Sequence, residues 1–148
     1  MNRHGKSVGK WISILYRHAQ SYFAGQMKSY NIGSGQYTFL LALYDRDGIS
    51  QEELSNQLMI DKGTTARAIN KLEKAGYVIR KTNTEDRRAY NLFITDKARE
   101  IKSALCKTSG SWTDILVADL SQEEREKLYV ILKKMVNSTM LYMKENGQ

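Results

Sequence analysis

The sequence contains no proline, a single cysteine and only two histidines. Because proline is absent, glycine and capping side chains must set the helix ends and tight turns. The one cysteine, Cys106, cannot form an intrachain disulfide, which favours a reducing compartment, and we expect a cytoplasmic protein. We expect Cys106 itself to be a buried thiol, with redox sensing as the alternative.

Features typical of membrane proteins and enzymes are also scarce. No apolar run approaches the ~20 residues that span a bilayer, and the basic N-terminus lacks a signal-peptide cleavage pattern. No metal-ligand cluster of familiar spacing and no nucleophile–base pair is visible. The Gly33–Gly35 segment follows a predicted helix, so it indicates a turn rather than a phosphate loop. We therefore expect no enzyme activity, metal, cofactor or membrane partner; a tight cofactor in the purified protein would reopen the enzyme alternative.

Positive charge, by contrast, is plentiful and unevenly distributed. The chain has 23 Lys and Arg residues against 16 Asp and Glu, a formal net charge of +7. Between residues 62 and 88, eight basic side chains accompany three acidic ones. A local excess of this kind favours an acidic partner, either nucleic acid or an anionic membrane surface.

Apolar periodicity predicts a mainly α-helical chain that forms one unit over residues 1–148. Ser50 with Glu53, and Ser121 with Glu124, have the spacing of capping boxes at helix starts. The predicted helices cover about residues 6–30, 36–45 and 62–75. A third helix is predicted to begin at Ser50, a long fifth helix to follow a Thr95 cap with an interruption near 109–111, and a sixth to begin at Ser121.

A β-hairpin is predicted after the fourth helix. Strands near residues 77–81 and 89–94 flank a turn-rich segment at 82–86. Two short helices, a tight connection between them and a basic hairpin make a helix-turn-helix with a wing. This order predicts a winged helix-turn-helix over residues 34–95, a shape that fits one helix into a DNA major groove.

The helix at 62–75 carries a polar, basic face opposite an apolar one. Ile69 and Leu72, with Thr65, point inward at helical spacing. Arginine can bind guanine through two acceptors and threonine can contact a thymine methyl, while lysines further along reach phosphates. An ordinary solvated face is the alternative. The residues of the basic face are Thr64, Arg67, Lys71 and Lys74.

The hairpin places basic residues close to its turn. An arginine at such a tip suits the minor groove, where negative potential is enhanced. We expect Asp86 to hold Arg88 in position by a charge-assisted hydrogen bond two residues away. The alternative role for these charges is to prevent sheet-to-sheet association. The basic residues concerned are Arg80, Lys81, Arg87 and Arg88.

Together these segments resemble the MarR family of winged helix-turn-helix transcriptional regulators. The resemblance rests on TTARAINKLEKAGYVIR at 64–80, EDRRAYNLFIT at 85–95 and Gly35-Gln36-Tyr37, and it extends over essentially the whole chain. It implies that Arg67 and its neighbours read bases, that Arg88 enters the minor groove with Asp86 as its support, and that Ser50 and Gln51 contact phosphates. The expected DNA-binding residues are Ser50, Gln51, Lys62, Thr64, Thr65, Arg67, Ala68, Lys71, Lys74, Arg80, Asp86, Arg87 and Arg88.

The resemblance also implies partners. Residues 1–32 and 96–148 would form a homodimer that sets two recognition helices in successive major grooves of a pseudo-palindromic operator. Both terminal segments carry long apolar stripes, which agrees with a partner surface, although the stripes could instead pack together within one chain. Family members commonly sense small aromatic or phenolic effectors, for which Arg17, His18, Tyr22 and Tyr37 offer charge and aromatic walls, unless they are simply core or rim residues.

The sequence therefore predicts a sequence-specific regulator that binds double-stranded DNA as a homodimer, most simply a ligand-responsive repressor. The alternative is a winged-helix module that binds protein and not DNA. Affinity for a duplex that falls steeply with salt would discriminate between them.

Overall fold

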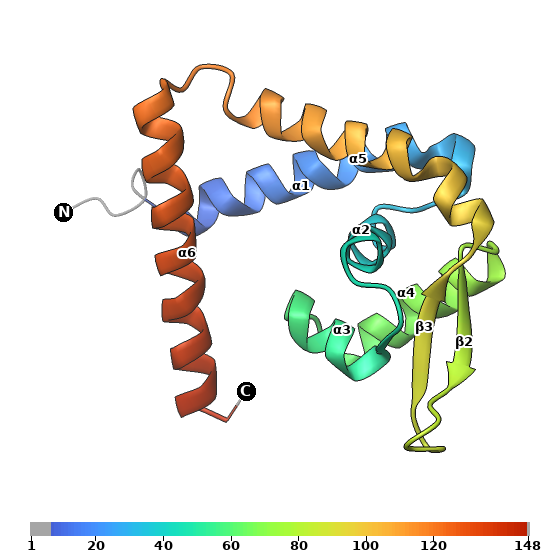
Figure 1. Ribbon diagram of the computed structural model, residues 1–148. Helices are drawn as coiled ribbons and strands as arrows, with labels where there is room; N and C mark the ends of the chain where they lie inside the picture. Colours follow the sequence, from blue (N-terminus) through green and yellow to red (C-terminus); the bar gives the residue numbers. More distant parts are fainter. Residues whose placement is uncertain (1–6, 148) are drawn as a thin grey trace. The chain divides into compact units, whose positions relative to one another are not determined.

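The computed structural model describes residues 7–147 of the chain (Figure 1). The chain divides into two compact units, Met1–Trp112 and Thr113–Gln148. The predicted fold class, mainly α-helical with a small antiparallel sheet, is confirmed. The elements are α1 (Val8–Met27), η2 (Lys28–Tyr30), α2 (Tyr37–Asp45), β1 (Ile49–Ser50), α3 (Gln51–Leu58), α4 (Lys62–Lys74), β2 (Val78–Thr82), β3 (Tyr90–Ile94), α5 (Asp96–Leu116) and α6 (Gln122–Glu145).

The sheet has three strands in the order β1-β3-β2, and both pairings are antiparallel. Strands β2 and β3 form the hairpin expected from the sequence, with Val78 opposite Ile94 and Thr82 opposite Tyr90. Strand β1 was not predicted, because two residues are too few to show an alternating pattern. It lies immediately before α3 and ties the start of that helix to the hairpin.

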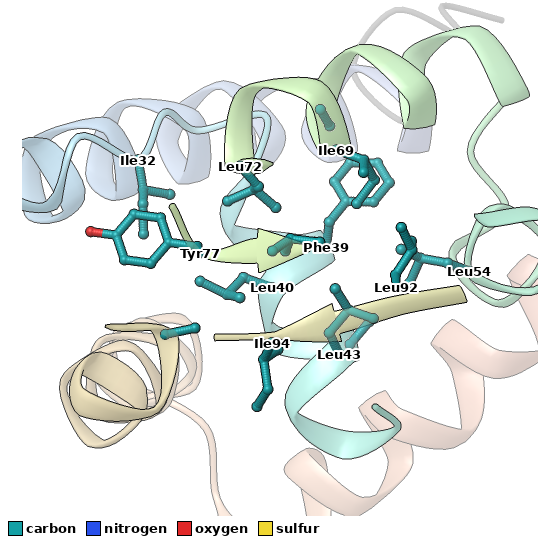
Figure 2. Close-up of a cluster of buried hydrophobic side chains, with 14 of the residues drawn as sticks. Ile32, Phe39, Leu40, Leu43, Leu54, Ile69, Leu72, Tyr77, Leu92 and Ile94 are labelled. Atoms are coloured by element: carbon teal, nitrogen blue, oxygen red, sulfur yellow. The ribbon is translucent and has the colours of Figure 1, made fainter. Parts of the chain in front are cut away.

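A single hydrophobic core joins the helix-turn-helix to the sheet (Figure 2). Helix α2 contributes the most to it, and α3, α4 and β3 close it from the other sides. Full burial of each such side chain stabilises the fold by about 1.5–3 kcal/mol. The labelled core residues in Figure 2 are Ile32, Phe39, Leu40, Leu43, Leu54, Ile69, Leu72, Tyr77, Leu92 and Ile94.

Local capping signals in the sequence are confirmed at the helix starts. Ser50 Oγ accepts a hydrogen bond from the Glu53 backbone N–H at 3.1 Å, and Glu53 Oε2 accepts one from the Ser50 N–H at 2.8 Å. The backbone hydrogen bond from Ser50 is the largest cause of a lowered pKa for Glu53. Ser121 and Glu124 form the same reciprocal box at the start of α6.

Two expectations for α5 are wrong. The helix runs without interruption through Gly110 to Leu116, because a glycine inside a helix costs only about 1 kcal/mol. Packing on one side offsets that cost: the Trp112 ring lies 5.1 Å from that of Tyr22, measured between centroids. Cys106 is exposed rather than buried.

The first helix also ends differently from its prediction. Helix α1 stops at Met27, a 3₁₀ turn continues to Tyr30, and Asn31 adopts a left-handed conformation with φ 56° that reverses the chain. The predicted start at Lys6 lies outside the described residues. Among the described helices, none is long and apolar enough to cross a membrane.

Large apolar side chains are exposed on α1 and, in the second unit, on α6. On α1 they recur at helical spacing and form one face. None of the described residues of α6 is buried. The exposed apolar residues of α1 are Val8, Trp11, Ile12, Leu15 and Tyr16, and those of α6 include Ile131, Leu132, Val136, Met140 and Met143.

Candidate nucleic-acid interface

Helix α4 is fixed at both ends by short, specific contacts. Asp61 caps its start, where Oδ1 accepts a hydrogen bond from the Thr64 N–H at 2.8 Å. Hydrogen bonds from the Thr64 side chain and backbone lower the pKa of Asp61. The capping carboxylate is therefore charged near neutral pH and interacts favourably with the positive end of the helix dipole. At the other end Gly76, with φ +81°, stops the helix.

Side chains from outside the helix-turn-helix hold the end of α4. Lys97 Nζ donates to the Ala75 carbonyl at 2.5 Å, and Thr95 Oγ1 donates to the Gly76 carbonyl at 2.6 Å. The Tyr77 hydroxyl donates to the Tyr30 carbonyl at 2.6 Å. The end of α4 is therefore tied both to the start of α5 and to the turn that follows α1.

The outward face of α4 is basic, as the sequence predicts. Lys62, Arg67, Lys71 and Lys74 are exposed. Arg67 Nη2 donates to Thr64 Oγ1 at 2.9 Å, so this hydroxyl orients the guanidinium along the helix. Lys62 forms an exposed ion pair with Glu52 at 3.0 Å; such pairs are worth only about 0–1 kcal/mol, and a phosphate can replace the carboxylate.

Two residues expected at the interface are buried instead. Thr65 is 0% exposed and Ala68 4%. The Thr65 hydroxyl donates to the Asp61 carbonyl at 2.9 Å, which satisfies it inside the fold. Both side chains lie on the core side of α4, away from its exposed basic face.

Arg80 is also not the free cation that the sequence suggested. Its side chain is only 23% exposed and forms an ion pair with Glu73. The same guanidinium donates to Asn70 and to Gln51. These partners lie on α4 and α3, whereas Arg80 lies on β2.

The turn of the wing is built by side chains that accept backbone hydrogen bonds. Asn83 Oδ1 accepts from the N–H groups of Glu85 and Asp86 at 2.8 and 3.2 Å. Asp86 Oδ1 accepts from the Arg88 backbone N–H at 3.0 Å. The expected hydrogen bond between Asp86 and Arg88 is therefore present, and it is made to the backbone of Arg88, so the aspartate shapes the turn.

Two arginines project from this turn. Arg87 and Arg88 are exposed, and no ion pair within residues 7–147 engages either guanidinium. They are consequently available to an external anion.

A hollow of about 340 Å³ joins the wing to the starts of α3 and α4. It brings together four of the predicted residues, Ser50, Gln51, Lys62 and Arg88, from separate parts of the chain. Tyr90 also lines the hollow and is 52% exposed, but it was not among the residues expected at the interface. Its place at the outer end of β3, beyond the core residues Leu92 and Ile94, could have indicated its exposure. The lining residues are Ser50, Gln51, Glu52, Ser55, Lys62, Arg88, Ala89 and Tyr90.

The comparisons with known proteins agree with this geometry. The model of the MarR family matches residues 32–90. The chain is 43% identical to a MarR transcriptional regulator from Methanosarcina mazei Go1, with a TM-score of 0.85 over 92% of this chain and 98% of that chain. The chain belongs to the MarR family.

Two further relatives extend the likeness. The HTH-type transcriptional regulator YybA of Bacillus subtilis is 26% identical over 140 residues, 93% of each chain. A MarR-family regulator from Listeria monocytogenes, solved in complex with a 26-mer DNA, is 27% identical, with a TM-score of 0.86 over 94% of this chain and 95% of that chain. This MarR-family protein is accordingly a transcriptional regulator with a winged helix-turn-helix for DNA binding.

The residues suggested for an effector site divide into two groups in this MarR-family protein. Tyr37 stacks on Phe23 at 3.7 Å between ring centroids, and the Tyr22 ring meets Phe23 edge-on at 5.3 Å. Burial raises the pKa of Tyr37. The other two, Arg17 and His18, are exposed, and no hydrogen bond or ion pair within residues 7–147 joins them to these rings. The structure thus brings the two tyrosines into one aromatic cluster without the charged pair.

Proposed function

We propose that this regulator is a ligand-responsive repressor that binds double-stranded DNA as a homodimer on a pseudo-palindromic operator. The observation that carries the proposal is one exposed basic surface shared by the outer face of α4 and the wing. The relative from Listeria monocytogenes solved with a 26-mer DNA supports it. This operator surface consists of Lys62, Arg67, Lys71, Lys74, Arg87 and Arg88.

Each part of the operator surface suits a different feature of a duplex. Arg67, held along the helix by Thr64, has the planar fork that matches the two acceptors of guanine. Lys71 and Lys74 lie further along α4 and fit phosphates. Arg88, at the tip of the wing, fits the minor groove. Ser50 and Gln51, beside the hollow, complete the contacts to the backbone of the duplex.

Dimerisation is assigned to the terminal segments, residues 1–32 and 96–148, and DNA binding to residues 34–95. The exposed apolar faces on α1 and α6 support this division, because contiguous exposed apolar surface usually marks a partner. A two-fold dimer presents two copies of α4 to two half-sites about 34–36 Å apart. Cys106 is the only cysteine, and with a DNA partner this favours a cytoplasmic location.

A small aromatic or phenolic effector would act by preferring one separation of the two recognition helices. A ligand with equal affinity for both separations would shift nothing. The aromatic cluster of Tyr22 and Tyr37, with Arg17 and His18 exposed on the same helix as Tyr22, is the assigned location for such a ligand.

Salt dependence is the experiment that tests DNA binding itself. We expect the logarithm of the affinity for a duplex to fall linearly with the logarithm of the salt concentration, with a slope of about −0.9 for each phosphate contacted. Fluorescence anisotropy of a labelled duplex, measured between about 50 and 300 mM salt, gives the slope. A flat response, or no binding, would favour the protein-binding module instead.

Arg67→Ala tests the assignment of base reading. We expect a loss of about 1–3 kcal/mol on the operator and relaxed preference at one position in each half-site. The duplex is one selected by the wild-type protein from a random pool, assayed beside its single-base variants. Lys71→Ala is the matched control: it should weaken binding to all sequences alike and reduce the salt slope by about 1.

Arg88→Ala should weaken binding through the minor groove. Unchanged affinity in both arginine variants would show that the base-reading surface lies elsewhere.

A further inference from the structure

We propose that Arg80 is a positioning residue that locks the wing to the recognition helix and makes no contact with DNA itself. This inference rests on the proposed DNA-binding function and reassigns one of its expected contacts. Glu73 and Asn70, neither of which was expected to matter for binding, become its partners.

The guanidinium of Arg80 joins three elements. Nη1 pairs with Glu73 Oε2 at 2.5 Å, and Nη2 donates to Asn70 Oδ1 at 2.6 Å and to Gln51 Oε1 at 3.3 Å. Asn70 and Glu73 are one turn apart on α4, while Gln51 begins α3. Arginine suits this role because its donors are fixed in one plane, so three acceptors also fix the orientation of the group.

Burial and charge both argue against a phosphate contact by Arg80. Its side chain is 23% exposed and that of Glu73 39%; every other ion pair within residues 7–147 has a partner more than half exposed. The paired charges present no net charge to a duplex. A phosphate would have to displace a carboxylate that is held together with two further hydrogen bonds.

The position of Arg80 in the hairpin explains what the lock achieves. Arg80 lies opposite Leu92, the last fully buried residue before the strands leave the core. Beyond it the hairpin extends toward Arg87 and Arg88. A contact with α4 at this point fixes the positions of the wing arginines relative to Arg67. The major and minor grooves can then be bound together without the entropy cost of ordering the wing.

The contact with Arg80 also sets the orientation of the side-chain amide of Gln51. Its amide oxygen accepts from Arg80, which leaves the NH₂ group as the outward donor. No other hydrogen bond within the described part of the chain engages this amide. Gln51 lines the hollow between α3 and the wing, and a donor there is what a phosphate oxygen requires.

The test compares two variants that remove opposite charges, Arg80→Gln and Glu73→Gln. The probes are the duplex selected by the wild-type protein and a random-sequence duplex of the same length. If the role is geometric, both variants lower the ratio of operator to random affinity by roughly tenfold, the size of a lost specific contact. The salt slope on the random duplex stays at the wild-type value in Arg80→Gln. Lys71→Gln, which removes one unpaired charge from α4, should reduce that slope by about 1.

Three results would overturn the proposal. The first is a slope for Arg80→Gln that falls as it does for Lys71→Gln, which would make Arg80 a phosphate contact. The second is opposite shifts in affinity for the two glutamine variants, which would mean that only charge matters. The third is an unchanged affinity ratio in both.

Misfolding does not imitate the expected result, because a smaller folded fraction lowers binding to both duplexes equally and leaves their ratio unchanged. Thermal unfolding of each variant records that fraction. If Arg80→Gln does not fold, Glu73→Gln keeps the arginine and still tests the lock. A wild-type protein that binds neither duplex would instead overturn the proposed function, and the role of Arg80 with it.

Discussion

Trp11→Glu should dissociate the proposed homodimer and weaken operator binding by roughly 100-fold or more, since two linked binding modules gain about 10²–10⁴ in avidity. Trp11 is 58% exposed on the apolar face of α1. A carboxylate there would have to be desolvated in a dimer interface, which is unfavourable without a partner. The fold of the single chain depends little on so exposed a residue, so the effect should fall on assembly.

Light scattering after size exclusion measures the mass of the variant, and titration of a one-half-site and a two-half-site duplex measures the affinities. We expect a monomer whose affinities for the two duplexes become similar. Ser13→Glu is the control: it adds the same charge about 200° around the helix, at 100° per residue, where Arg17 four residues on can pair with it. A dimer that survives Trp11→Glu would remove α1 from the proposed interface.

Phe39→Ala should lower the free energy of unfolding by about 3–5 kcal/mol, because truncating a buried phenylalanine leaves a cavity. Phe39 is 1% exposed and shares the core with Ile69 and Leu72 of α4 (Figure 2). The loss is a large part of the ~5–15 kcal/mol that holds a typical domain folded. The substitution should also weaken the packing that holds α4 in position.

Urea denaturation followed by circular dichroism measures this loss. Tyr90→Ala is the control, since it removes an aromatic ring that is 52% exposed, and surface changes of this kind are usually within about 0.5 kcal/mol. Equal destabilisation by the two substitutions would mean that Phe39 is not the centre of the core.

The features that sequence predicts here are those set by neighbours along the chain. The capping boxes at Ser50 and Ser121 each depend on residues within one helical turn, so their spacing alone identifies them. The fold class followed from the order of these signals. Gly110 shows the limit: its sequence context suggests a break, but packing of Trp112 keeps α5 continuous.

Arg80 shows what the sequence could not predict, because its contacts join separate segments of the chain. Arg80 seemed a free cation until β2 brought it to Glu73 and Gln51, 7 and 29 residues away in the chain. The bond between Asp86 and Arg88, by contrast, joins residues two positions apart, and the sequence spacing predicted it. Thr65 points inward as the helical pattern predicts, and its side chain is fully buried.

The way α4 is anchored has a consequence for how such regulators diverge. Its supports are Asp61 at one end, Lys97 and Thr95 at the other, and Ile69 and Leu72 beneath. None of these lies among the outward residues Arg67, Lys71 and Lys74, which can therefore be replaced with little change in folding stability. We expect descendants of one ancestral chain to acquire new target sequences by drift at these few exposed positions, while the anchoring residues stay under purifying selection.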